Sequence, residues 1–544
     1  MRHGHSNAAE RGFATIDKVK HVFRHNRFII ETSGFSRDDQ GLQVLRFNDE
    51  YEAFVTSQTE FGRICDHTQI NVPLNLIGPI NACRQQGKSA NMTDMFPEIS
   101  RADVNLSVGG MDDLKDSNMM LSLIEAAPFH LEREACDWVM SALSKMDTSA
   151  RVRQLFVHFS SGNDPGEAQR IADLAPAGIV RFFGTDGDAE LQLIEEIHEL
   201  ASFPLLVGAD LEGSRTSPPF ATDFPNALSL AAINDLAVTR AVAETMAREA
   251  LAGGVNWALA PVLDINAAFR SPIVGTRSFG SDLDIIKRQT SAHIDAFQKA
   301  GMAATAKHWP GEGHDDRDQH LLTTSIPLTV QEWQATHGSM YAAAIEAGVL
   351  SIMSGHISFP AFVEELDQAA GVEAFRPASL SKVLNTMLLR GKFGFNGVIV
   401  SDATIMGGYR SWGRHRDILP DVVANGCDII LFSDDPEADF RIVMEAVESG
   451  RITEARLEEA VLRILALKAA LGFHRKPTRI DRKRLKAPDA TQLSQAAFAS
   501  VPTLVKDARR TPPFSSQIPK AARPHDRDCW VTWSASTAQR DQPA

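Results

Sequence analysis

Short apolar runs alternate with amphipathic segments from about residue 131 to residue 472. The runs are mostly aliphatic, which is typical of parallel strands buried on both faces. Between them, apolar residues recur at helical spacing, as in helices that cover such a sheet. Eight runs are expected to be strands: 155–159, 178–183, 205–210, 257–262, 302–308, 350–354, 398–401 and 428–432.

Helical periodicity is clearest in five segments: 131–145, 231–252, 285–300, 330–347 and 454–471, the last followed by Gly472 as a C-cap. Strands that alternate with helices predict a parallel α/β domain. About eight strands favour a (β/α)8 barrel of the TIM type over a doubly wound open sheet. The first strand–helix junction also lacks a dinucleotide-type glycine fingerprint, which weighs against the open sheet.

The barrel domain is therefore predicted at residues 128–475. Residues 1–127 carry no chemical motif, although 28–32 could be a strand, and we interpret them as an irregular N-terminal extension of unknown role. Residues 476–544 are interpreted as a short C-terminal tail. Two strand-like stretches in this tail, 503–507 and 530–533, are too little for an independent core.

Composition narrows the possible partners and compartments. The formal net charge of −14 argues against a general nucleic-acid binder. Five scattered cysteines make a disulfide framework unlikely and favour a reducing compartment. No apolar run reaches the roughly 18 residues of a membrane span. The start of the chain has no signal-peptide core, so a cytoplasmic protein is expected unless the true start lies elsewhere. The oligomeric state stays open.

Polar side chains follow several of the predicted strands. Asp210, Asp264, His356 and Asp402 each stand at or just beyond a strand end, where TIM barrels place their active groups. The densest cluster runs from Lys307 to His320 and reads Lys-His-Trp-Pro-Gly-Glu-Gly-His, then Asp-Gln-His at 318–320. Such charged groups are costly to bury without partners, so the cluster predicts a site.

Each candidate has a chemical and a structural interpretation. Asp402 could be the nucleophile of a retaining glycosidase, or it could cap the following helix. Asp318 could orient His320 as a general acid and base, or both could belong to an ordinary surface loop. A zinc site on His308, His314 and His320 is a third hypothesis, although their spacing matches no standard zinc signature.

These motifs resemble glycoside hydrolase family 3, in particular its β-N-acetylhexosaminidase branch. The family pattern is Lys-His-Phe-Pro-Gly-His-Gly, then five positions later Asp-Ser-His, and residues 307–313 and 318–320 keep that register. Three further stretches agree in order: 260–265 leading to 275–280, 377–381 leading to 397–402, and 424–428. The resemblance covers roughly residues 131–472.

The resemblance implies a retaining exo-β-N-acetylglucosaminidase that acts on small carbohydrates, either peptidoglycan fragments or chito-oligosaccharides. Asp402 matches the nucleophile, and His320 with Asp318 matches the acid/base dyad of this branch. Four residues match those that hold hydroxyls of the terminal sugar: Asp210, Arg277, Lys307 and His308. The resemblance implies no metal and no organic cofactor.

Several positions depart from the family pattern. Glu312 replaces a His, Trp309 replaces a Phe, and Asp-Leu-Glu-Gly-Ser-Arg at 210–215 replaces Asp-Gln-Glu-Gly-Gly-Arg. The stretch 504–507 resembles the opening of the family's second domain, which would then be truncated. A β-glucosidase, an N-acetylglucosaminide phosphorylase and a catalytically weak carbohydrate-binding protein stay open as alternatives.

Overall fold

The computed structural model describes residues 32–37, 43–47, 51–55, 117–475 and 478–501. The chain divides into two units, residues 1–103 and residues 104–544. The described part of the first is an antiparallel sheet of β1 (Thr32–Arg37), β2 (Gln43–Phe47) and β3 (Tyr51–Val55). Of the strand expected at 28–32, only Thr32 is described, and it begins β1. The stretches 503–507 and 530–533 lie outside the described residues.

The second unit contains a barrel of eight parallel strands, one at each predicted run. In chain order they are β4 (Phe156–Ser161), β5 (Gly178–Phe182), β6 (Leu206–Ala209), β7 (Trp257–Ala258), β8 (Ala303–Trp309), β10 (Ser351–Ser354), β12 (Val398–Ser401) and β13 (Ile430–Leu431). Each pairs with the next, and β13 pairs with β4. A parallel bridge between Val400 and Ile429 joins β12 to the β13 segment. The ring is thereby closed, and the predicted (β/α)8 fold is confirmed.

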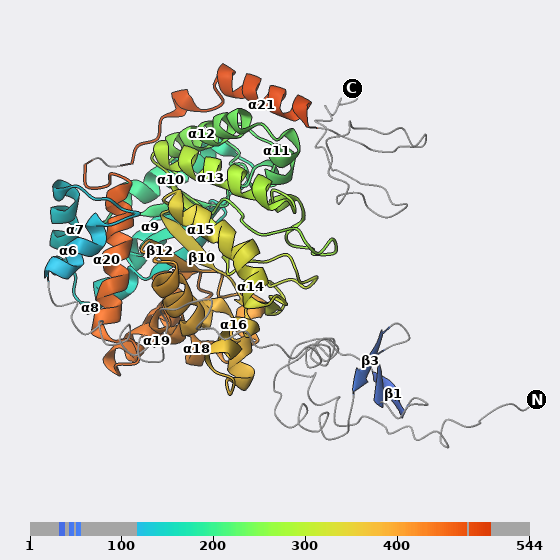
Figure 1. Ribbon diagram of the computed structural model, residues 1–544. Helices are drawn as coiled ribbons and strands as arrows, with labels where there is room; N and C mark the ends of the chain where they lie inside the picture. The colour runs from blue at the N-terminus through green and yellow to red at the C-terminus, as the bar shows by residue number, and fades with distance from the viewer. Residues whose placement is uncertain (1–31, 38–42, 48–50, 56–116, 476–477, 502–544) are drawn as a thin grey trace, which may run out of the picture. The chain divides into compact units, whose positions relative to one another are not determined.

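Helices surround the strands (Figure 1). They are α6 (Ser117–Glu125), α7 (Arg133–Lys145), α8 (Thr148–Arg153), α9 (Glu167–Leu174), α10 (Gly187–Leu200), α11 (Ala227–Ile233), α12 (Leu236–Ala252), α13 (Leu283–Lys299), α14 (Val330–Trp333), α15 (Ser339–Glu346), α16 (Pro360–Leu366), α17 (Gly407–Arg410), α18 (His415–Ala424), α19 (Pro436–Glu448), α20 (Glu454–Ala470) and α21 (Pro488–Ser500). Their inner faces and the strands form the apolar core. A short parallel pair, β9 (Thr324–Ser325) with β11 (Ile357–Ser358), lies outside the barrel sheet.

Two predicted helices differ in detail from the structure. The segment 231–252 is broken, because Asn234 takes a left-handed conformation with φ of 52° and Asp235 caps α12 by accepting from the Ala237 N–H at 2.8 Å. The segment 330–347 is helical throughout, but the turn Gln334–Gly338 between α14 and α15 is a π-helix. Hydrophobic periodicity cannot distinguish these local hydrogen-bond choices.

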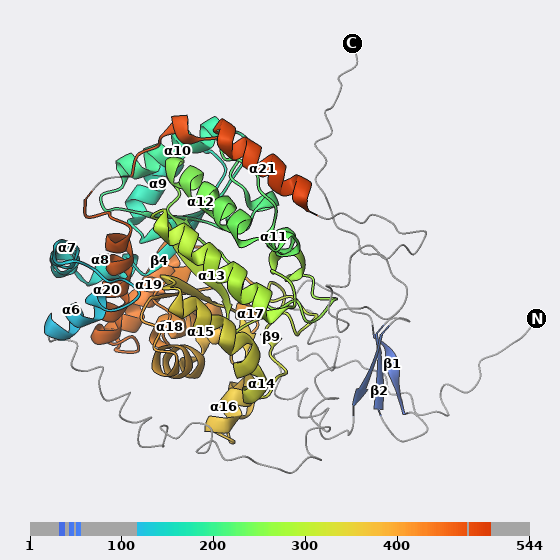
Figure 2. The same cartoon turned by 45° about the horizontal axis from the view of Figure 1, so that its top comes forward.

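Beyond residue 477 the structure describes a further helix, α21, which hydrophobic periodicity did not predict. Figures 1 and 2 both show this helix beside α12. Ser494 Oγ donates to the Asp223 carbonyl at 2.6 Å, and Arg248 pairs with Asp489 at 3.1 Å. The charge-rich residues before α21 are likewise attached, since the Asp481 N–H donates to the Ala252 carbonyl that ends α12.

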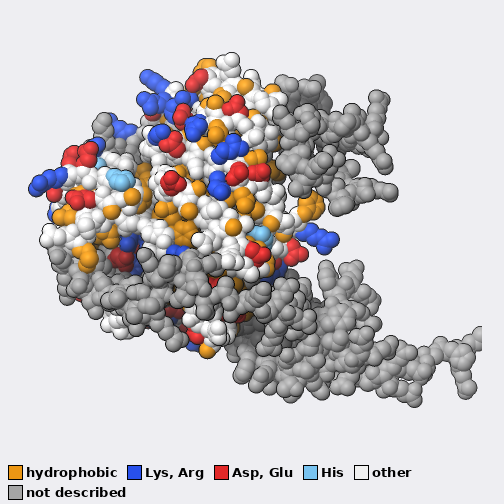
Figure 3. Space-filling view, in the orientation of Figure 1, with side chains coloured by type: hydrophobic (Ala, Val, Ile, Leu, Met, Phe, Trp, Pro, Cys, Tyr) orange, Lys and Arg blue, Asp and Glu red, His pale blue; other side chains and the backbone are white. Residues whose placement is uncertain are grey.

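Figure 3 shows basic and acidic side chains interspersed over the face that carries α12 and α13. Cations of these helices pair with acids, as Arg248 does with Asp489 and Lys287 with Asp284. Among the described residues, no helix is both long and apolar enough to cross a bilayer.

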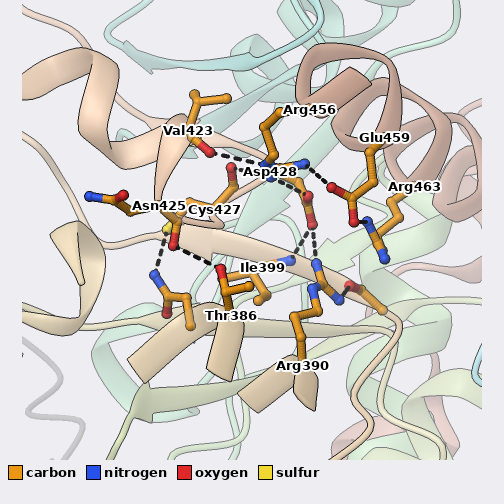
Figure 4. A network of polar contacts seen from close by, with 12 residues as sticks. Thr386, Arg390, Ile399, Val423, Asn425, Cys427, Asp428, Arg456, Glu459 and Arg463 are labelled. Atoms are coloured by element: carbon orange, nitrogen blue, oxygen red, sulfur yellow. Dashed lines mark hydrogen bonds and ion pairs between the residues drawn. The ribbon is translucent and has the colours of Figure 1, made fainter. Parts of the chain in front are cut away.

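A buried ionic network holds the last strands against α20 (Figure 4). Asp428 Oδ2 accepts from Arg390 at 2.6 Å and from the Ile399 N–H of β12 at 2.9 Å. Asp428 Oδ1 accepts from Arg456 of α20 at 2.8 Å. Burial raises the pKa of Glu459, but Arg463 and Arg456 outweigh it and lower that pKa to about 2. The Glu459 carboxylate therefore stays charged, and Asp428 connects α20 to β12 and to Arg390.

Replacing Asp428 with Ala should lower the free energy of unfolding by about 3–5 kcal/mol, because buried guanidinium groups then lose their counterion. Denaturant unfolding measures this. Asp295→Ala is the matched control: its partner Lys299 is 72% exposed, and its loss should cost about 0.5 kcal/mol or less. Equal losses in the two variants would contradict the role given to the network.

Candidate functional site

The carboxyl ends of the barrel strands carry a connected set of polar side chains. Asp264, just beyond β7, is 1% exposed and accepts three N–H groups. Its Oδ2 accepts from His308 Nδ1 at 2.7 Å, and its Oδ1 accepts from the backbone of His308 at 3.1 Å and of Glu312 at 2.9 Å. Burial raises the pKa of Asp264, but His308 and these bonds lower it overall. The carboxylate therefore fixes the turn that follows β8.

Lys307 on β8 is the centre of a second group. Its Nζ lies 2.9 Å from Asp210 and 2.6 Å from Glu212, and Glu212 also binds Arg277 through two bonds of 2.8 Å. Burial raises the pKa of Glu212, but Lys307 and Arg277 outweigh it and hold that pKa far below its usual value. Asp210 is 36% exposed at its side chain and Arg277 is 28% exposed. Both can therefore reach a ligand.

Glu312 behaves differently from the other acids. Its side chain is buried in the turn after β8, where Gln319 donates to it at 3.0 Å and Thr324 at 3.3 Å. Burial, followed by the charges of Asp264 and Asp402, raises its pKa well above the usual value. Burial and the neighbouring carboxylates therefore favour the uncharged form of Glu312, whereas the surroundings of Asp264 and Glu212 favour the ionised form.

Asp402 follows β12 and does not cap a helix. Its Oδ1 accepts from the neighbouring Ala403 N–H at 2.8 Å, whereas the N-cap of α17 is Met406. Burial raises the pKa of Asp402, but the nearby imidazoles of His308 and His356 outweigh it, and the pKa is lowered. The carboxylate is therefore ionised at neutral pH and buried beside the polar cluster, as an attacking carboxylate must be.

Asp318 and His320 form the expected pair. Asp318 Oδ1 lies 2.7 Å from His320 Nδ1 and accepts from the His320 N–H at 2.9 Å. The imidazole is 51% exposed, so its Nε2 is accessible. The His320 carbonyl accepts from Gly407 N at 2.7 Å. The pair is therefore hydrogen-bonded to the loop that begins at Asp402, so it does not belong to a surface loop without contacts to the barrel.

The three histidines of the zinc hypothesis do not form a ligand set. His314 instead packs against the His337 ring, at 5.1 Å between centroids. Among the described residues, the group whose ligand atoms lie within 4.8 Å is Asp264, His308 and Glu312. Hydrogen bonds already occupy the Asp264 and Glu312 oxygens, and the raised pKa of Glu312 disfavours the carboxylate that a metal ion would bind. The arrangement fits a hydrogen-bonded cluster better than a metal site.

Aromatic rings occupy the remaining sector of the rim. Phe159 lies in β4, Phe182 ends β5 and Phe432 follows β13, and their ring centroids are 4.9–5.7 Å apart. Ser160 and Arg181 hydrogen-bond to carboxylates of α9 and α10, so Phe159 and Phe182, one position away, point to the opposite side of the sheet. Phe432 joins them with a left-handed φ of 46°. Phe159 and Phe182 are about 40% exposed and offer ring faces rather than hydrogen-bonding groups.

A parallel barrel whose rim combines a buried ionised carboxylate, an Asp–His pair and a cluster of hydroxyl-binding charges has the components of a glycosidase. Comparison with known proteins agrees. Residues 166–467 match the glycosyl hydrolase family 3 N-terminal domain. The chain therefore belongs to glycoside hydrolase family 3 and is a glycoside hydrolase that acts on carbohydrate.

Individual relatives point to related activities. The chain is 38% identical to a β-N-acetylglucosaminidase/β-glucosidase of Cellulomonas fimi, over 71% of this chain and 69% of the relative. It is 32% identical to a β-hexosaminidase of Xanthomonas oryzae pv. oryzae, over 55% of this chain and 86% of the relative. Among solved structures, the β-glucoside phosphorylase BglX with bound 2FGlc matches with a TM-score of 0.67 and 31% identity, over 72% of this chain and 71% of that one. A family 3 β-N-acetylglucosaminidase from Paenibacillus has a TM-score of 0.60 and 28% identity, over 65% and 69%.

The structure joins the predicted residues to others that the sequence did not single out as site residues. Asp210, Arg277 and Lys307 converge through Glu212, and His308 is held by Asp264. Asp264 was visible as a polar strand end, and Glu212 as an acid two positions after Asp210. Gln319 gave no signal, because an amide between two charged residues resembles any loop residue.

Glu212→Gln should raise KM about 10- to 100-fold with a smaller change in kcat, because Lys307 and Arg277 lose the shared carboxylate that orients them. Initial rates over a range of glycoside concentrations test this. Glu244→Gln, an exposed acid on α12, is the control and should leave KM unchanged. A Glu212 variant that loses kcat at constant KM would contradict the binding role.

Proposed function

We propose that the protein is a retaining exo-β-N-acetylglucosaminidase, with peptidoglycan fragments or chito-oligosaccharides as substrates. The observation that carries this proposal is the 2.7 Å Asp318–His320 pair on a loop bonded to the Asp402 loop. It supports the placement of an acid/base group and a nucleophile on one rim. The similarity to enzymes named as β-N-acetylglucosaminidase and β-hexosaminidase supports the choice of sugar.

In the first step, Asp402 attacks the anomeric carbon while His320 gives a proton to the leaving oxygen. Since Asp402 Oδ1 is held by the Ala403 N–H, we assign the attack to Oδ2. His320 Nδ1 faces Asp318, so Nε2 transfers the proton. In the second step, His320 takes a proton from water, the water oxygen bonds to the anomeric carbon, and Asp402 leaves as a carboxylate.

We assign binding of the terminal sugar to the groups around Lys307 and His308. Asp210 accepts from sugar hydroxyls and Arg277 donates to them, since both side chains are partly exposed. Lys307, 2% exposed, mainly holds Asp210 and Glu212 in place and presents any remaining N–H to the sugar. His308 Nδ1 is engaged by Asp264, which leaves Nε2 for the substrate.

Phosphorolysis is the second candidate. An imidazole presents less negative charge to an anionic acceptor than a carboxylate does, so phosphate could replace water in the second step. The similarity to a β-glucoside phosphorylase favours testing it, as the Cellulomonas relative favours testing β-glucosides. The phosphate oxygen would then bond to the anomeric carbon and yield a glycosyl phosphate.

Wild type should release sugar faster from a nitrophenyl β-N-acetylglucosaminide than from the matching β-glucoside. Asp402→Asn should lower kcat by about 10⁴-fold or more, because the covalent step is lost. Adding inorganic phosphate and measuring glycosyl phosphate separates the two acceptors. Preference for the glucoside would overturn the choice of sugar, and full activity in Asp402→Asn would overturn the mechanism.

A further inference from the structure

Two side chains that depart from the family motifs contact each other. Glu312 stands where the motif has His, and Gln319 stands where it has Ser, between Asp318 and His320. Gln319 Nε2 donates to Glu312 Oε2 at 3.0 Å. Both residues are almost fully buried, at 1% and 3% exposure for Gln319 and Glu312. The two departures are therefore complementary.

Gln319 also joins the segments that follow three strands. Its Nε2 reaches Glu312 after β8, its Oε1 accepts from the His356 N–H after β10 at 2.9 Å, and its carbonyl accepts from Gly408 N after β12 at 3.0 Å. His356 Nε2 in turn lies 2.9 Å from the carbonyl of Ala403, the residue after Asp402. One amide side chain thus connects the loop of the Asp–His pair to the surroundings of the carboxylate.

The side chains on either side of Gln319 are much less enclosed. Asp318 is 24% exposed and His320 is 51% exposed, and their shared hydrogen bond lies within the same loop. That bond fixes the imidazole relative to Asp318 but not relative to the barrel. The buried Gln319 and the backbone bonds to α17 provide the attachment to the barrel.

We propose that Glu312 and Gln319 are a matched pair of positioning residues that set the place of His320 relative to Asp402. The pair acts through the dyad, so it rests on the function proposed above. Glu312 is also connected to the proposed sugar-binding residues, because its N–H donates to the Asp264 carboxylate that holds His308. The network therefore connects sugar binding to proton transfer.

The charge state of Glu312 suits this role. Asp264 and Asp402 face it from the β7 and β12 ends, Arg277 interacts from the loop after β7, and Thr324 is hydrogen-bonded to it. The raised pKa favours the uncharged form, in which Glu312 accepts from Gln319 without adding a third negative charge to those of Asp264 and Asp402.

The test compares Gln319→Ala with Gln298→Ala. Gln298 is a matched control, since its amide also donates to one group and accepts from another, Gly348 O at 2.7 Å and Leu350 N at 2.9 Å, at the start of β10 away from the rim. Rates are measured on two β-N-acetylglucosaminides, one with a dinitrophenyl leaving group and one with a methyl group. The value of kcat/KM reports the first step, in which a good leaving group needs little protonation. A loss of kcat/KM on the methyl glycoside alone therefore reports the placement of His320 and not a smaller folded fraction.

Gln319→Ala should lower kcat/KM about 10- to 100-fold on the methyl glycoside and change kcat/KM on the dinitrophenyl glycoside much less. Glu312→Ala should show the same pattern, and the double variant should be no worse than either single one. Glu312→Gln, which keeps an uncharged acceptor, should stay close to wild type. Gln298→Ala should leave both rates unchanged.

Equal losses on both substrates, or additive losses in the double variant, would overturn the pairing while leaving the proposed function intact. A wild type that cleaves neither substrate, with water or with phosphate, would overturn the proposed function. Amide hydrogen exchange then decides on the pair: Gln319→Ala must speed exchange in residues 318–322, and unchanged exchange there rejects it.

Discussion

The carboxylate of Asp264 is the interaction on which the polar half of the barrel rim depends. Two N–H groups of His308 in β8 and one of Glu312 in the following turn point at its two oxygens, and with 1% exposure it has almost no water to satisfy it instead. An unpaired carboxylate in that position would be very costly, so the turn must bring its donors there. The direction of His308 and the burial of Glu312 follow from this one requirement.

Neighbouring charges distinguish the buried acids of the rim. Asp402 and Glu212 lie close to cations or imidazoles and stay charged, whereas Glu312 lies close to other carboxylates, which favour its neutral form. All three are enclosed, so burial alone does not separate them. The identity of the nearest charge does, which is how one rim can hold both an anionic and a neutral carboxyl group at the same pH.

The barrel and the strand-end acids were predictable because each has a one-dimensional signature. Eight apolar runs gave eight strands, and Asp210, Lys307 and Asp402 appeared where such strands end. The break at Asn234 depends on a single backbone conformation, and the φ of Phe432 turns a ring against the usual alternation. The contact between Gln319 and Glu312 depends on the fold of the turn. Periodicity cannot report any of these three.

The network around Asp428 has a consequence for how the chain is made. One edge of β4 pairs with β5, but the other edge stays unpaired until β13 has been made. Arg456 of α20, made later still, then binds Asp428 next to β13. At ordinary rates of protein synthesis, tens of seconds separate the appearance of β4 from that of α20. During this interval the nascent sheet has an unpaired edge, the kind of surface that recruits other strands. Chaperone protection at the ribosome would therefore matter most before residue 456 emerges.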